Sequence, residues 1–350
     1  MQLRPPRREF LGGAAALAAS TCMSLTHLSA GQPFHGSRQA RPTSTRTAPS
    51  DLTKSPFRIA VINDEISQDF GHACEVASQE FGINWIELRG MWNKNIVSLD
   101  ATEIVEARRI LEKYNLRVTD IASPLFKVDW PGAPKSKFSP NHDQFNADYT
   151  FDQQNEVLQR SIEVAIQFGT DRIRCFDFWR LADASPYRAA MNEKLRSAAE
   201  TLSKQRMILV LENEAACNTA TAAEAAKVLA AIPAPTFMLN WDPGNATAAG
   251  EKPFPEGYNL LPKGRIGHCH CKDAAQKSAG AGGPGGSEYE WAAMGNGVID
   301  WTGQFAALKR DGYHFAVSLE THWRGAGTPE GSSRLSWAGM KTELTVAKCL

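Results

Sequence analysis

The chain has 350 residues, enough for one large domain or two of ordinary size. Its 38 basic and 38 acidic residues balance, but residues 1–55 hold seven of the former and two of the latter, so residues 56–350 hold 31 and 36. A mildly acidic domain is poorly suited to holding a phosphate backbone, so we expect no nucleic-acid partner. The seven cysteines are odd in number and scattered, which argues against a disulfide framework.

The N-terminal segment has the features of an export signal. Arg7 and Arg8 precede Phe10 and an apolar run over residues 11–25 without an acidic residue, a pattern that resembles a Tat-type signal peptide. A chance basic tail or an ordinary membrane anchor is the alternative, although the run is short and rich in alanine and glycine for crossing a bilayer. We expect residues 1–30 to be a Tat-type signal peptide. The processed protein is then periplasmic or otherwise extracytoplasmic, without stable membrane association.

Residues 31–55 are rich in Ser, Thr, Pro, Arg and Gln, a composition that predicts a disordered linker. From residue 56 onward, strand-like and helical segments alternate along the chain. Strands are expected at residues 57–63, 84–90, 117–124, 171–178, 207–214, 236–242, 265–273 and 314–321. Helices are expected at residues 67–81, 101–114, 153–168, 187–204, 220–231, 300–310 and 334–347.

Eight strands at intervals of roughly thirty residues, mostly separated by helices, predict an α/β fold: a single-domain (β/α)8 TIM barrel over residues 56–350. A doubly wound open sheet is the alternative, but no glycine-rich phosphate turn follows the first strand. Two loops after strands are long, residues 126–152 and 274–298. Loops of this length tend to be lids or insertions. For the glycine-rich run at residues 280–286, a tether without function is the alternative.

Four side chains that metals prefer lie near the C-terminal ends of four successive predicted strands: Glu212, Asp242, His270 and Glu320. In a TIM barrel these strand ends share one face, where active sites form. Three carboxylates and one imidazole that meet there would bind a divalent cation such as Mn²⁺, Mg²⁺, Co²⁺ or Zn²⁺. A buried polar network is the alternative, but clustered acids without a cation would repel one another and need raised pKa values.

Four segments of these strands together resemble one known family: ENE at 212–214, DPGN at 242–245, HCHCKD at 268–273 and LETH at 319–322. In this order they are similar to the xylose isomerase-like TIM-barrel superfamily, the sugar phosphate isomerase/epimerase group, over residues 56–350. The resemblance implies one divalent metal ion, held by Glu212, Asp242, His270 and Glu320. The family's H-x-x-D spacing favours His270 over His268. The Glu-Asn pair favours Glu212, although Glu214 points to the same face.

A centre of this kind suits proton transfer beside a carbonyl group. A divalent ion stabilises the negative charge that develops on a substrate oxygen when the neighbouring C–H bond breaks. Carboxylates that bind the ion stay ionised near neutral pH and can accept the proton. In the family's ketose epimerases, the residues that match Glu212 and Glu320 play these parts through an enediolate intermediate. The resemblance therefore implies that both glutamates are catalytic.

Further residues near the same strand ends are candidates for substrate binding. Lys272 shares a face with His270 and could hold a substrate oxygen, or it could pair with an acid such as Glu87. Arg324 could bind an anionic group or lie solvated in its loop, and tryptophans at strand ends suit the apolar face of a sugar ring. The full candidate set is Lys272, Asn245, His268, Glu87, Trp241, Trp323 and Arg324.

Asn245 departs from the family pattern, because many relatives have a histidine three residues after the aspartate. An amide is a weaker metal ligand, which argues against the multi-metal apurinic endonuclease branch. We expect a metal-dependent isomerase or epimerase that acts on a small carbohydrate. The alternatives are a dehydratase or lyase that uses the same enolate, and a non-catalytic sugar-binding barrel. The sequence is compatible with a homo-oligomer.

Overall fold

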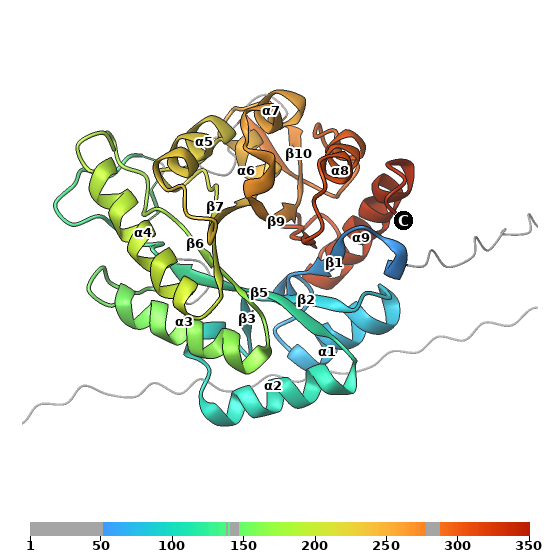
Figure 1. The fold of residues 1–350 in the computed structure, drawn as a ribbon. Helices are drawn as coiled ribbons and strands as arrows, with labels where there is room; N and C mark the ends of the chain where they lie inside the picture. The colour runs from blue at the N-terminus through green and yellow to red at the C-terminus, as the bar shows by residue number, and fades with distance from the viewer. Residues whose placement is uncertain (1–51, 138, 141–146, 278–287) are drawn as a thin grey trace, which may run out of the picture. The chain divides into compact units, whose positions relative to one another are not determined.

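The computed structural model describes residues 52–137, 139–140, 147–277 and 288–350 (Figure 1). The predicted signal peptide, the predicted linker up to residue 51 and the glycine-rich run at 280–286 lie outside these residues. Within the described part of the chain, no helix is both long enough and apolar enough to cross a membrane.

Eight parallel strands form one sheet, in the order β1, β12, β9, β8, β7, β6, β5 and β2. Their bounds are β1 Arg58–Val61, β2 Trp85–Leu88, β5 Arg117–Leu125, β6 Arg172–Cys175, β7 Ile208–Glu212, β8 Phe237–Trp241, β9 Ile266–Cys271 and β12 Ala316–Leu319. A parallel bridge between Ile62 and Glu87 joins the two ends of this order, so the sheet is nearly closed into a barrel. The predicted (β/α)8 TIM barrel is confirmed.

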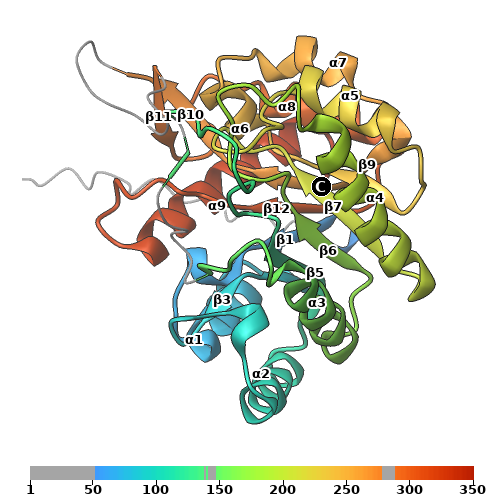
Figure 2. The ribbon, with the colours of Figure 1, turned by 90° about the vertical axis from the view of Figure 1, so that its left-hand side faces the viewer.

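Helices surround the strands, as Figures 1 and 2 show. Their bounds are α1 Phe70–Glu75, α2 Ala101–Lys113, α3 Gln154–Phe168, α4 Arg188–Lys204, α5 Ala222–Ala231, α6 Pro243–Ala248, α7 Tyr258–Leu260, α8 Trp301–Arg310 and α9 Pro329–Val346. All seven predicted helices form. The short helices α6 and α7 were not predicted, because six and three residues are too few to show a helical period.

Local sequence determines where several of these helices begin and end. The Asp100 side chain accepts hydrogen bonds from the backbone N–H groups of Thr102 and Glu103, and Glu103 bonds back to the N–H of Asp100. This capping box starts α2. Helix α9 begins at Pro329 rather than at the predicted residue 334, because Thr328 caps its first turn.

Two short hairpins were not predicted. Strand β3 (Gly90–Met91) pairs with β4 (Lys94–Asn95), and β10 (Asp273–Gln276) pairs with β11 (Tyr289–Ala292). Apart from Asp273, the second hairpin lies inside the predicted loop 274–298, and it begins two residues after the end of β9 (Figure 2). The first of its strands, with the sequence DAAQ, has none of the β-branched or aromatic residues that indicate a strand.

Alternation along the strands separates the apolar core from the barrel interior. On β8, Leu239 and Trp241 are fully buried in the apolar core, whereas Asn240 between them reaches His270 inside the barrel. On β9, Cys269 and Cys271 are buried free thiols of the same core. The polar residues of these strands therefore point into the barrel.

Replacement of Leu239 by alanine tests this packing. Leu239 is completely buried, so the cavity left by Leu239→Ala should lower the free energy of unfolding by about 2–5 kcal/mol. Val105 on α2 is 65% exposed, so Val105→Ala should change it by less than about 0.5 kcal/mol. Urea unfolding followed by circular dichroism, with EDTA present, measures both values. Equal losses in the two variants would contradict the assignment of Leu239 to the core.

Candidate metal centre

Four predicted ligands meet at the C-terminal ends of adjacent strands. Glu212 ends β7, Asp242 follows β8, His270 lies in β9 and Glu320 follows β12. Strands β7, β8, β9 and β12 are consecutive neighbours in the sheet, and all are parallel. One ligand atom from each residue lies within 4.8 Å of those of the other three, and all four side chains are buried.

The ring nitrogen Nδ1 of His270 lies at the centre of this group. It is 3.3 Å from Glu212 Oε1, 3.1 Å from Glu320 Oε2 and 3.6 Å from Asp242 Oδ2. The other oxygen of Asp242, Oδ1, accepts a hydrogen bond from the Asn245 backbone N–H at the start of α6. Oδ2 is buried and faces the centre of the group, where Lys272 Nζ lies 2.8 Å from it. Three carboxylate oxygens and one imidazole nitrogen around one point are a donor set that fits a divalent cation.

Two arginines orient the glutamates of the group. Arg174 Nη1 lies 3.0 Å from Glu212 Oε2, and Arg89 Nη1 lies 2.7 Å from Glu320 Oε1. Each arginine binds one carboxylate oxygen and leaves the other facing His270. Burial alone would raise the pKa of Glu212, but His270 and Arg174 outweigh burial and lower it to about 2. Both glutamates are therefore held with one oxygen directed at the centre.

Glu87 binds the ring nitrogen of His270 that points away from the three clustered acids. Its Oε1 lies 2.9 Å from His270 Nε2, and its Oε2 lies 3.0 Å from His268 Nε2. A carboxylate at Nε2 directs Nδ1 of His270 toward the three acids, as carboxylates do behind metal-binding histidines. Glu87 and His268 are completely buried. In the structure Glu87 and His268 therefore lie behind His270 in the barrel interior, and their predicted contact with substrate stays a prediction.

Lys272 lies on the same face as His270, as predicted, but its partners differ from the one expected. Its Nζ is 2.8 Å from Asp242 Oδ2 and 2.7 Å from Glu320 Oε2, and the predicted alternative partner, Glu87, lies beneath His270. Burial would lower the pKa of Lys272, but Asp242 and Glu320 outweigh burial and raise it. Lys272 is therefore a charged ammonium group at the edge of the proposed metal position.

Asn245 and Glu214 also have clear positions. The Asn245 side-chain amide donates to Glu212 Oε1 at 3.1 Å and to the Asn213 carbonyl at 2.9 Å, so it lies beside the group. Glu214 was the alternative to Glu212 as the predicted metal ligand, but its carboxylate accepts a hydrogen bond from the Ala216 N–H. The four-residue group contains Glu212 and not Glu214.

The other predicted substrate contacts lie away from the group or have other partners. Trp241 is fully buried in the apolar core and donates its indole N–H to Gln304 on α8, so it is not a substrate contact. Trp323 is partly exposed, and its ring lies against Gly325. Arg324 is not merely solvated, because its Nη2 lies 2.9 Å from Glu65 Oε2.

Sequence reasoning missed several residues of the site. Arg89 lies two residues after Glu87, and Arg174 lies two residues after Arg172. Because side chains two apart in an extended segment share a face, this spacing could have indicated both arginines. His322 lies within the LETH segment, with Nε2 3.1 Å from Glu320 Oε1. Trp291 on β11 lies over Lys272, with its ring centroid 5.2 Å from Nζ. No local pattern of the sequence indicated either contact.

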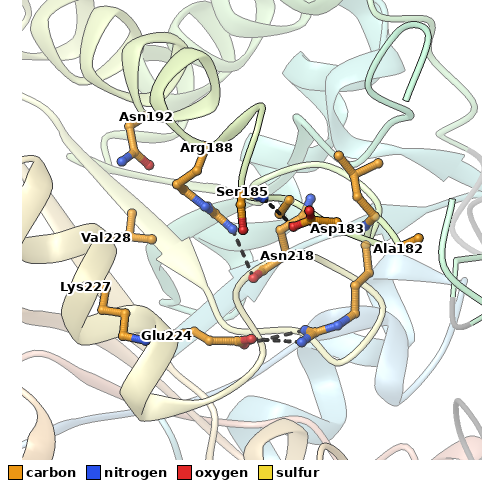
Figure 3. Close-up of a pocket in the computed structure, with 12 residues that line it drawn as sticks. Ala182, Asp183, Ser185, Arg188, Asn192, Asn218, Glu224, Lys227 and Val228 are labelled. Atoms are coloured by element: carbon orange, nitrogen blue, oxygen red, sulfur yellow. Dashed lines mark hydrogen bonds and ion pairs between the residues drawn. The ribbon is translucent and has the colours of Figure 1, made fainter. Parts of the chain in front are cut away.

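A separate cavity of about 410 Å³ lies between the loop before α4 and helix α5 (Figure 3). Its lining includes none of the four clustered residues. Two of its cations already have partners: Arg180 pairs with Glu224 at 2.8 Å, and Arg188 donates to the Asn218 carbonyl at 3.1 Å. We therefore do not place the functional site in this cavity.

Metal content of a matched pair of variants tests the centre. Glu212→Gln removes one of the clustered carboxylates, so the affinity for Zn²⁺ should fall by more than the roughly 10–100-fold typical for an outer partner. Glu214→Gln should leave that affinity unchanged, because Glu214 lies outside the group. Elemental analysis and competition with a chelating dye measure both. Equal losses of metal would contradict the assignment of Glu212.

Removal of the Lys272 charge gives a second test. Lys272→Met removes an ammonium group 2.8 Å from Asp242 Oδ2, so repulsion of an incoming cation should decrease. The affinity for Zn²⁺ should then rise by about tenfold or more. Lys227 on α5 is exposed, and Lys227→Met serves as the control. A weaker affinity in Lys272→Met would show that Lys272 helps to hold the metal position.

A family model described as "Xylose isomerase-like TIM barrel" matches residues 76–341. No curated protein sequence is similar enough to match. Among solved structures, the probable 3-DHS dehydratase AsbF from Bacillus anthracis is 19% identical with a TM-score of 0.59, over 81% of this chain and 98% of that chain.

Two further structures are similar. The IOLI protein with a bound zinc atom is 14% identical with a TM-score of 0.60, over 83% of this chain and 98% of that one. The 3-keto-D-glucoside 4-epimerase YcjR from E. coli is 16% identical with a TM-score of 0.58, over 82% and 99%. At such low identities, the TM-scores and coverage show a shared fold alone. Because the family model covers most of the sequence, the chain belongs to the xylose isomerase-like TIM barrel family.

Proposed function

We propose that the protein is a divalent-metal-dependent enzyme that isomerises or epimerises a small carbohydrate by moving a proton beside a carbonyl group. The observation that supports this most is the position of two carboxylates around His270. Glu212 approaches from β7 and Glu320 from β12, with β8 and β9 between them in the sheet. Two bases on different sides of one centre can remove a proton from one position of a substrate and return it at another.

Glu212, Asp242, His270 and Glu320 would hold the ion, which supplies positive charge that stabilises the oxyanion formed when the C–H bond breaks. One glutamate accepts the proton, and the electron pair of the C–H bond moves into the enediolate. The other glutamate, ionised at the start, takes up a proton from solvent and delivers it to carbon, and the first glutamate then releases its proton to solvent. An epimerase delivers the proton to the opposite face of the same carbon. An isomerase delivers it to the neighbouring carbon, while the adjacent hydroxyl proton moves to the former carbonyl oxygen.

The charge state of the two glutamates supports these roles. The pKa of Glu320 would be raised by burial, but Lys272, His322 and His270 outweigh burial and hold it well below its usual range. Glu320 and Glu212 are therefore ionised at neutral pH and able to accept a proton. Lys272 remains protonated and can donate a hydrogen bond to a substrate oxygen. Arg89 and Arg174 keep the two carboxylates oriented during the transfer.

A dehydratase or lyase is the second candidate, and one observation favours it. Lys272 Nζ lies 2.7 Å from Glu320 Oε2, so a proton donor stands beside a base. Loss of water from an enolate needs such a donor to protonate the departing hydroxyl group. The similar structures include a protein described as a probable 3-DHS dehydratase as well as one described as an epimerase. The family thus supports both reaction types.

Hydrogen exchange in D₂O tests the proposal. Protein loaded with Mn²⁺ or Zn²⁺ should introduce deuterium at the carbon beside the carbonyl of at least one keto-sugar of a panel, as measured by NMR. Glu212→Gln and Glu320→Gln should each lower the exchange rate by about 10²–10⁴-fold, because each lacks a base. Treatment with EDTA should abolish exchange, and added metal should restore it.

The products separate the candidate functions. Retention of all atoms with exchange indicates an isomerase or epimerase, whereas loss of water or of a fragment indicates a lyase. Glu214→Gln is the matched control and should retain wild-type exchange, since Glu214 lies outside the group. Sugar binding without exchange or elimination in the wild-type protein would contradict both enzymatic functions and support a non-catalytic sugar-binding barrel.

A further inference from the structure

The β10–β11 hairpin brings an aromatic ring to the metal centre. Trp291 on β11 has its ring centroid 5.2 Å from Lys272 Nζ, and the same Nζ contacts Asp242 and Glu320. The ring also packs edge-on against His322, with 5.6 Å between ring centroids. Trp291 is partly exposed. The residue therefore lies beside the proposed metal position and keeps part of its surface in contact with solvent.

Asp273 holds this hairpin in place. It directly follows Lys272 and starts β10. Its buried carboxylate accepts hydrogen bonds from one backbone N–H group before β11 and from three after it. The donors are the N–H groups of Ala274, Gly295, Gly297 and Ile299. The pairing of Ala274 with Trp291 then sets the position of the tryptophan along the hairpin. The aromatic surface is therefore built onto the strand that carries His270.

The cations around the centre are already paired with carboxylates. The pairs are Lys272 with Asp242, Arg89 with Glu320, Arg174 with Glu212 and Arg324 with Glu65. A phosphate or carboxylate on a substrate would therefore meet cations whose charge is already compensated. The site combines the partly exposed ring of Trp291 with cations that already have carboxylate partners.

We propose that Trp291 is a specificity-determining residue whose indole stacks on the C–H face of an uncharged, closed sugar ring that carries the reacting carbonyl. This inference rests on the proposed function and names its substrate class. A closed ring presents several C–H groups in one plane, and aromatic rings bind such a surface well. An open-chain sugar presents no such plane and gains little from the indole.

Binding to the metal-loaded full-length protein tests this inference separately from catalysis. Three probes are compared by isothermal titration calorimetry: methyl 3-keto-glucopyranoside, whose ring is locked; L-erythrulose, which cannot close a ring; and fructose 6-phosphate, which is anionic. The wild-type protein should bind the glycoside at least about tenfold more tightly than the other two. Trp291→Ala should weaken glycoside binding about tenfold and leave erythrulose binding unchanged. Trp291→Phe should lose about threefold or less.

The controls separate a binding role from a structural one. Glu290→Ala changes an exposed neighbour on the same strand and should bind the glycoside as the wild type does. All variants should retain the metal content and circular dichroism of the wild type. Equal glycoside affinity in wild type and Trp291→Ala, or tightest binding of the phosphate, would overturn this inference while the proposed function stands. Absence of both binding and exchange for every sugar in the wild-type protein would overturn both.

Discussion

Electrostatic repulsion between three buried carboxylates is the constraint on which the rest of this structure depends. Glu212, Asp242 and Glu320 lie within ion-pair distance of one imidazole nitrogen and are almost completely removed from water. Carboxylates in such a place take up protons unless cations compensate them. Arg89 after β2, Arg174 on β6 and Lys272 after β9 supply part of that compensation. Each arginine leaves one carboxylate oxygen of its partner facing the common point. A divalent cation is the ligand that this arrangement fits.

The barrel explains why residues more than a hundred positions apart can form such a centre. Parallel neighbouring strands end on one face, so the last inward residue of each strand reaches the same point. Helix α6 begins at that face, and its first turn holds one oxygen of Asp242. Gly244 in the same turn leaves room for the stem of Lys272, which any larger side chain would overlap. The metal position and the substrate side of the site are thus built from the same loops.

Much of this could be predicted from the sequence, because strand ends and the inward positions next to them follow a simple period. That reasoning found the eight strands and the four clustered residues. The same reasoning predicted a substrate contact for Trp241, because it lies at the end of a strand. Its neighbours Asn240 and Asp242 face the site, and neighbours in a strand point to opposite faces, so the indole of Trp241 lies in the core. Trp291 could not be found, since its position depends on four backbone hydrogen bonds to Asp273, and those form only in the folded chain.

One cation should bind at the point shared by the four side chains. Anomalous X-ray diffraction from crystals of the cobalt-loaded protein would locate it. We expect a single strong peak about 2.0–2.2 Å from His270 Nδ1 and from one oxygen each of Glu212, Asp242 and Glu320. A peak at the neighbouring group of Glu65, Glu320 and His322, or no peak between the four residues, would contradict it.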